Sequence, residues 1–115
     1  MKFMMLMYEP QDDFAARTEE GRKEAYWSHW RAYTQAMREA GVLAYPGNVV
    51  QPAGTACTVT AADGAVETRA GSYADTPEQL GGYYMLEVRD ADEAVEWASR
   101  APAAVRGSVE LRPVL

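Results

Sequence analysis

Residues 18–41 read TEEGRKEAYWSHWRAYTQAMREAG, and this stretch decides how the rest of the chain can fold. A set of apolar side chains recurs every three or four positions, which is the spacing of one helix face. These side chains are Tyr26, Trp30, Tyr33, Met37 and Ala40. Thr18 can cap the helix at its start, and Gly41 suits the left-handed residue that ends it. We therefore predict a helix that runs to Ala40 and lies with its apolar face on a sheet.

An apolar strand is expected before this helix and a β-hairpin after it. Residues 3–8 are apolar almost without interruption, which is typical of a central strand, and Glu9-Pro10 ends the run. Residues 56–60 and 65–68 flank the pair Asp63-Gly64, which accepts the positive φ angles of a tight hairpin turn.

The remaining segments complete an α+β plan. Further strands are expected at residues 42–45, interrupted by Pro46-Gly47-Asn48, and at residues 83–88 and 108–112, with a second helix at residues 91–100. The order is ferredoxin-like βαββαβ with an inserted β-hairpin, an arrangement in which two helices cover one face of an antiparallel sheet. Because the other face has no cover within the chain, we expect a second copy to cover it in a homodimer.

Length, charge and cysteine content exclude several classes. The 115 residues suit one domain, here residues 1–115, and the formal net charge of −6 makes a nucleic acid an unexpected partner. No segment approaches the roughly 20 apolar residues of a membrane span. Cys57 is the only cysteine, which excludes an internal disulfide and fits a reducing, cytoplasmic location. One histidine with scattered acids predicts neither a metal nor a cofactor.

Residues 74–84 read Ala-Asp-Thr-Pro-Glu-Gln-Leu-Gly-Gly-Tyr-Tyr. This segment resembles the one that follows the Asp-Gly-Pro-Phe signature in the DGPF branch of the YCII-related family. Residues 90–98 and 107–114 resemble the closing helix and strand of that family, so the resemblance covers nearly the whole chain. It implies a ferredoxin-like domain that pairs into a dimeric α+β barrel with a cleft for a small molecule.

The resemblance also implies catalytic residues. In YCII-related proteins a histidine of the first helix and an aspartate of the signature loop have been proposed to act together. His29 stands at the position of the helix histidine. The signature reads Ala70-Gly71-Ser72-Tyr73 here, so its carboxylate is missing, and Asp75 is the next acid along the chain. We therefore expect His29 to act as general acid or base, with Asp75 as its partner.

Each of these residues also has a purely structural interpretation. His29 would be a half-buried histidine bonded to a carbonyl or to Ser28, and Asp75 would cap a turn in a solvated loop. The residues expected to bind a substrate are Tyr8, Trp30, Ser72, Tyr73 and Tyr83. Neighbouring strand residues face opposite sides, so Tyr83 and Tyr84 cannot enter one pocket together, and core packing is the alternative for the strand tyrosines.

Two functions stay open from the sequence. The first is a cofactor-independent lyase, isomerase or cyclase-like enzyme that transfers protons on a compact cyclic or aromatic substrate. The second is a non-catalytic small-molecule-binding or accessory protein that has lost the signature carboxylate at Ala70. The sequence indicates neither the substrate, nor the direction of a reaction, nor a physiological protein partner.

Overall fold

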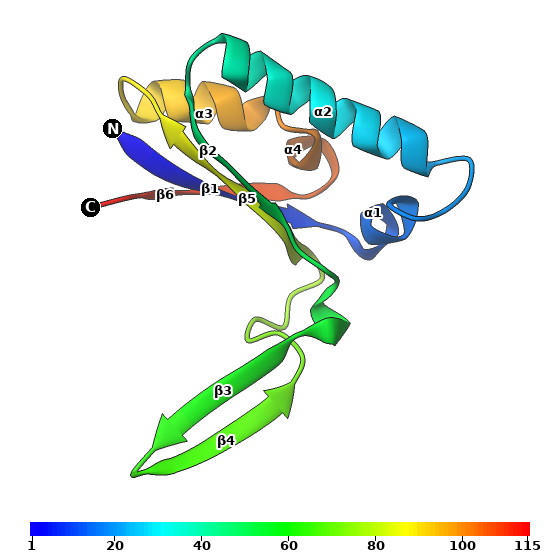
Figure 1. Cartoon of the computed structure of the whole chain (residues 1–115), viewed down its shortest axis with the longest axis vertical. Helices are drawn as coiled ribbons and strands as arrows, with labels where there is room; N and C mark the ends of the chain where they lie inside the picture. The colour runs from blue at the N-terminus through cyan, green and yellow to red at the C-terminus, as the bar shows by residue number, and fades with distance from the viewer.

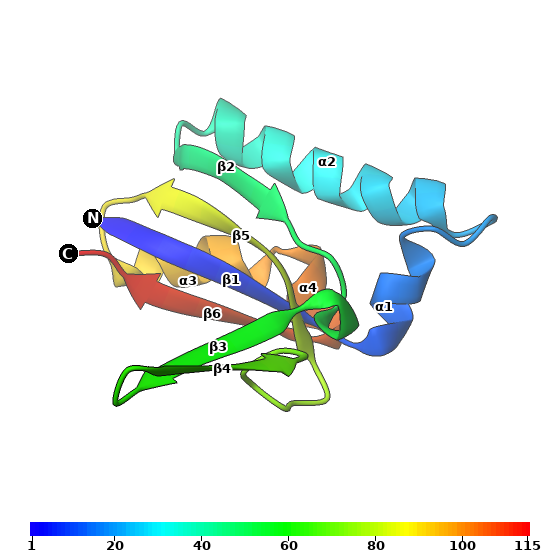
Figure 2. The same ribbon diagram turned by 60° about the horizontal axis from the view of Figure 1, so that its bottom comes forward.

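A four-stranded antiparallel sheet forms the centre of the computed structural model, which describes all 115 residues. Its strands are β1 (Lys2–Glu9), β2 (Leu43–Val49), β5 (Gln79–Glu87) and β6 (Ser108–Pro113). They lie in the order β2-β5-β1-β6, which Figure 2 shows together with both chain termini at one end of the sheet. Without the hairpin this is the ferredoxin-like order, so the α+β fold expected from the sequence is confirmed.

Helices α2 (Lys23–Glu39) and α3 (Ala91–Ser99) cover one face of this sheet (Figure 1). The Tyr33 hydroxyl of α2 donates to the Trp97 carbonyl of α3 at 2.7 Å, which joins the two helices. Alternate residues of β1 and β5 complete the core with residues of the two helices: Phe3, Met5, Met7, Tyr33, Met37, Tyr84, Leu86, Ala94, Trp97 and Ala98. None of the helices combines the length and the apolar character needed to cross a membrane.

Two short helices were not predicted from the sequence, and the long helix begins later than expected. Helix α1 (Gln11–Ala16) follows Pro10 directly, and α4 (Pro102–Arg106) begins at a proline, a residue suited to the first helical turn. Residues 17–22 form turns, with Gly21 at a φ of 88°, so Thr18 caps no helix. A six-residue helix is too short to be stable alone, and α1 depends on burying Phe14 and Ala16.

Strand β2 includes Pro46 and Gly47, although these residues were expected to interrupt it. It is an edge strand, where proline is tolerated, and its pairing with β5 has two irregularities. Gly47 has a φ of 65°, and a Cβ atom there would lie 1.6 Å from the Tyr83 carbonyl oxygen. The close approach of β2 to β5 therefore requires a glycine at this position.

We expect Gly47→Ala to lower the free energy of unfolding by at least about 2 kcal/mol, because the strain of the left-handed backbone adds to this steric clash. Gly41 provides the matched control. Its φ is 73°, but a Cβ atom there meets no atom within 4 Å, so Gly41→Ala should cost only about 1 kcal/mol. Urea unfolding of both variants measures the difference, and equal losses would contradict the clash at Gly47.

The predicted hairpin is confirmed as a separate two-stranded sheet of β3 (Cys57–Ala62) and β4 (Ala65–Ala70). A short 3₁₀ helix, η1 (Ala53–Thr55), precedes it. Asp63 and Gly64 both have positive φ angles, 50° and 78°, as a tight turn between strands requires. The hairpin extends away from the main sheet (Figure 1), and nearly all of its residues are exposed, including Cys57.

Candidate functional site

A cavity of about 550 Å³ lies between helix α2 and the sheet edge formed by β2 and β5. Its volume falls within the range of small-molecule sites, roughly 300–1,000 Å³. Successive turns of α2 line the cavity on one side, and Gly81 and Gly82 line it on the other. Trp27 and Trp30 supply aromatic surface from the helix, and Trp30 stacks on Tyr84 with ring centroids 6.4 Å apart. The cavity thus offers flat apolar surfaces to a ligand.

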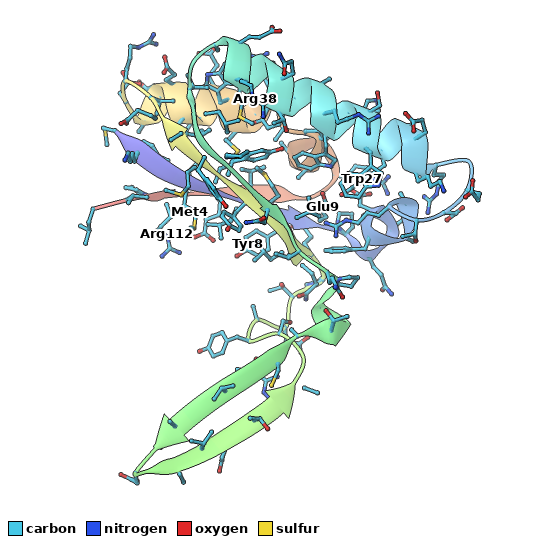
Figure 3. All side chains as sticks on the ribbon, in the orientation of Figure 1. Met4, Tyr8, Glu9, Trp27, Arg38 and Arg112 are labelled. Atoms are coloured by element: carbon cyan, nitrogen blue, oxygen red, sulfur yellow. The ribbon has the colours of Figure 1, made fainter.

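Three polar side chains meet where β1 ends at this cavity. Glu9 is the last residue of β1 and is only 2 % exposed. The Tyr26 hydroxyl donates to its carboxylate and lies 2.8 and 2.7 Å from the two oxygens. The same hydroxyl accepts a hydrogen bond from Arg17 Nε at 3.2 Å, and Arg17 Nη2 lies 3.6 Å from Glu9 Oε2. Figure 3 shows Glu9 at the same end of α2 as Trp27.

Arg17 is held in place by contacts that are distant in the sequence. Its Nη1 and Nη2 atoms donate to the carbonyls of Val50 at 2.6 Å and Gly81 at 2.9 Å. Its guanidinium lies over the Phe14 ring, 4.4 Å from the centroid, and its own carbonyl accepts from Trp27 Nε1 at 3.0 Å. These contacts fix the charge beside Glu9 and connect α1 to the ends of β2 and β5.

The Gly81-Gly82 pair permits the close approach of these groups. A Cβ atom at Gly81 would lie 2.8 Å from Arg17 Nη2 and 3.2 Å from the Glu9 carboxyl carbon. A Cβ atom at Gly82 would lie 2.9 Å from the Asn48 carbonyl oxygen of β2. The absence of side chains at these two positions therefore allows β5 to lie close to Arg17, Glu9 and the β2 backbone.

The environment of Glu9 changes its ionisation. Burial raises the pKa of this carboxyl, and it outweighs the hydrogen bond from Tyr26 and the charge of Arg17, which lower the pKa; nearby Asp13 raises it slightly further. Burial also raises the pKa of the Tyr26 hydroxyl, so this group stays protonated as a hydrogen-bond donor. A carboxyl with a raised pKa can give and take a proton closer to neutral pH than an ordinary glutamate.

This raised pKa predicts a pH-dependent stability. The folded protein binds the Glu9 proton more tightly than the unfolded chain does. The free energy of unfolding therefore falls as the pH rises. This fall begins near the ordinary glutamate pKa, roughly 4.3, and ends above the pKa of Glu9 in the folded protein. Glu9→Gln removes the titrating group. We expect the melting temperature of the wild type to fall relative to that of Glu9→Gln across this window, as measured by thermal unfolding at closely spaced pH values. A difference that does not vary with pH would contradict the raised pKa.

His29 is exposed on α2 and lines a second, smaller cavity of about 290 Å³. Glu9, Tyr26 and Trp30 line both cavities, so the cavity beside His29 adjoins the larger one at the buried carboxylate. His29 is exposed, so the structural interpretation of His29 as a half-buried residue was wrong. His29 therefore lies next to the larger cavity rather than in it.

The loop between β4 and β5 holds the other residues expected from the family signature. Asp75 is exposed and lines neither cavity, and Tyr73 is 87 % exposed. Ser72 Oγ lies 2.8 Å from the Ala74 carbonyl oxygen and 3.1 Å from Gln79 Oε1, so it shapes the loop itself. Within one chain Asp75 and His29 do not share either cavity, and their joint role stays a prediction.

The aromatic residues expected to bind a substrate fall on two sides of the sheet. Trp30 lines the larger cavity with its ring on Tyr84. Tyr83 also lines it, so Tyr83 and Tyr84 line the same cavity, and the expectation that they could not enter one pocket together was wrong. At the β2 edge Asn48 Nδ2 donates to the Tyr83 hydroxyl at 3.0 Å. Strand alternation directs Tyr8 to the face opposite the helices, and Tyr8 does not line this cavity.

Glu9, Arg17 and Tyr26 were not predicted as site residues. A signal for Glu9 was present, because it continues the alternation of Phe3, Met5 and Met7 and so falls on the buried face. Tyr26 was assigned to the apolar stripe of α2, and no local pattern indicated Arg17. The structure contains no group of three or more His, Cys, Asp or Glu side chains arranged to hold a metal ion.

Comparisons with known proteins agree with this architecture. A protein-family model described as the YCII-related domain matches residues 1–115. Among solved structures, the chain is similar to 5-chloro-2-hydroxyhydroquinone dehydrochlorinase from Burkholderia phenoliruptrix AC1100, in a complex with 2,5-dihydroxybenzoquinone. The TM-score is 0.51 at 14 % sequence identity, over 100 % of this chain and 94 % of that one, which is a likeness of fold. A comparison with curated protein sequences gives no match.

Proposed function

The chain belongs to the YCII-related domain family, and on that premise we propose that it acts on a cyclic or aromatic small molecule bound in the cavity between α2 and the β2–β5 edge. The observation that carries the proposal is the pairing of aromatic surface with a buried acid, because Trp27 and Trp30 line the same cavity as Glu9. Aromatic rings stack favourably on such side chains. The ring compound bound by the structural neighbour supports this ligand class, and residues 74–84 support assignment to the DGPF branch.

The chemistry that suits this site is proton transfer without a cofactor, as in a lyase, isomerase or cyclase. Protonated Glu9 gives its proton to the bound ring compound, and the Tyr26 hydroxyl and Arg17 stabilise the carboxylate that forms. The carboxylate then takes a proton from another atom of the substrate, which restores Glu9. One proton is given and one is taken, so the cycle needs no oxidant or reductant. His29 with Asp75 is the alternative assignment of this role.

Binding of a ring compound tests the proposal, with 2,5-dihydroxybenzoquinone and related hydroxylated rings as probes in isothermal titration calorimetry. We expect Trp30→Ala to weaken binding by about tenfold or more, because it removes stacking and apolar contact. Tyr73→Ala is the matched control, since Tyr73 is an exposed aromatic outside the cavity, and it should bind like the wild type. No binding of any probe, or a loss on Tyr73→Ala alone, would overturn this placement.

The second candidate function is a non-catalytic binding or accessory protein that uses the same cavity. Ala70 favours it, because this residue stands where the family signature has its carboxylate and it lies exposed in the hairpin opposite Cys57. Binding without any proton exchange between ligand and solvent would identify this function.

A homodimer is the proposed state of the protein, because two apolar surfaces have no cover within the chain. The first is the open face, defined as the side chains on the sheet surface away from the helices: Met4, Leu6, Tyr8, Tyr45, Tyr83 and Met85. Pairing places Met4 opposite Met85 and Leu6 opposite Tyr83, so these side chains form continuous rows. Figure 3 shows Met4 and Tyr8 on this side, with Arg112 at its margin.

The second apolar surface is one side of the projecting hairpin. Strand alternation and register place small and apolar residues together on it: Cys57, Val59, Ala61, Val66, Thr68 and Ala70. Val59 and Val66 are 61 % and 69 % exposed, and the opposite side carries Thr58, Thr60, Glu67 and Arg69. A two-stranded hairpin is marginally stable when it stands alone. A second copy supplies both an apolar sheet face and an apolar arm, so one symmetric pairing would cover both surfaces.

A further inference from the structure

We infer that the ligand of the larger cavity is an elongated anion, with its ring at the Glu9 end and an acidic tail that extends along α2 to Arg38. This inference rests on the proposed function and adds the charge and length of the ligand to it. It follows from the charges that line the cavity, from the cavity's size, and from the arrangement of polar groups along the helix.

The charged residues of the cavity are mostly basic, unlike those of the whole chain. The chain has 11 basic and 17 acidic residues, yet the cavity is lined by Arg17, Arg31 and Arg38 and by Glu9 as its one acid. With Glu9 ionised the lining carries a formal charge of +2, and with Glu9 protonated it carries +3. A low-dielectric cleft of one sign concentrates ligands of the opposite sign, which here are anions.

The size of the cavity exceeds what one ring needs. A cavity of roughly 150 Å³ is sufficient for benzene, whereas this one measures about 550 Å³. It also extends along the helix, because Trp27 and Arg38 both line it and are separated by about 16 Å of helix rise. Figure 3 shows these two residues near opposite ends of α2. A ring beside Glu9 therefore leaves space toward Arg38.

The polar groups that line this remaining space suit an anion. Arg31, Gln35 and Arg38 follow one another at helical spacing on the cavity side of α2. Arg38 has no carboxylate within 4.0 Å and donates only to Gln35 Oε1 at 3.1 Å, while Gln35 Nε2 bonds to Glu39. Arg31 pairs with Glu24 at 3.0 Å, but both side chains are largely exposed, and such a pair contributes little. Arg38 is thus free to bind a carboxylate through two hydrogen bonds.

Two probes with the same ring and tail and different charge test this inference: 3-(2,5-dihydroxyphenyl)propanoate and the corresponding propanamide. We expect the wild type to bind the acid at least about tenfold more tightly than the amide, since charge-assisted hydrogen bonds are the stronger ones. In Arg38→Gln this preference should fall to near unity while affinity for the amide is unchanged. Arg38→Lys should retain part of the preference.

Arg89→Gln is the matched control, because Arg89 is an exposed arginine outside the cavity and its loss changes the net charge equally. It should keep the full preference for the acid. Equal binding of acid and amide by the wild type would overturn the inference and leave the proposed function intact. If Arg38→Gln still binds the acid more tightly than the amide, the acidic tail does not bind at Arg38. If neither probe binds, in a protein shown to be folded by circular dichroism, the proposed function fails as well.

Discussion

Glu9→Gln is expected to remove most of any proton-transfer activity, by about 10² to 10⁴-fold, while the fold and the cavity are kept. Glutamine has the shape of glutamate and can still accept the hydrogen bond from Tyr26, but it cannot give or take the proton. Exchange of solvent deuterium into a bound ligand, followed by nuclear magnetic resonance, measures this activity before the complete reaction is known. Tyr26→Phe should lower the rate less, because the carboxylate keeps Arg17.

His29→Ala is the decisive comparison for this prediction. If Glu9 transfers the proton, His29→Ala should leave exchange within a few-fold of the wild type, because His29 lines the adjoining cavity and not the larger one. A large loss on His29→Ala combined with near-normal exchange in Glu9→Gln would reverse the assignment in favour of the family histidine. In a non-catalytic protein the ligand would bind and no variant would change the exchange of its protons.

The elements that follow from local rules could be predicted from the sequence. The 3.6-residue period of α2 correctly predicts that Tyr33 and Met37 are buried, whereas Ala40, expected in the same stripe, is the C-cap residue and is exposed. Asp63 and Gly64 both adopt the positive φ angles of the predicted tight turn. Asp90 caps α3 as expected, because its side chain accepts a hydrogen bond from the Glu93 amide at 2.9 Å. These features depend on neighbours within four residues, so a single sequence contains the necessary information.

The site depends on contacts that a single sequence does not contain. Arg17 bonds to Gly81, 64 positions away, and no local pattern distinguishes it from a surface arginine. Glu9-Pro10 was expected to follow a strand of residues 3–8, yet Glu9 is the last residue of β1 and its side chain is buried. The family signature led the prediction to His29 and Asp75, whereas the cavity assembles around residues from β1, the turn after α1, and α2.

Placing a charge on the hairpin is expected to separate the proposed dimer into monomers. Val66 is exposed and makes no core contact in its own chain, so Val66→Lys should leave the fold unchanged. In the dimer the lysine would be buried against the partner, and the dimer dissociation constant should rise by at least about 100-fold, as for other central interface residues. Sedimentation equilibrium over a range of concentrations measures this change.

Thr60→Lys is the matched control for the hairpin, because Thr60 lies on the opposite, polar side of the same two strands. This substitution should leave the dimer intact. Met4→Lys tests the open face separately and should also yield monomers, since Met4 lies in the row with Met85. If Met4→Lys dissociates the dimer and Val66→Lys does not, the sheet face alone forms the interface and the arm is not part of it. If the wild-type protein sediments as a monomer at micromolar concentration, neither the open face nor the hairpin forms a dimer interface. The open face would then need a partner other than a second copy of this chain.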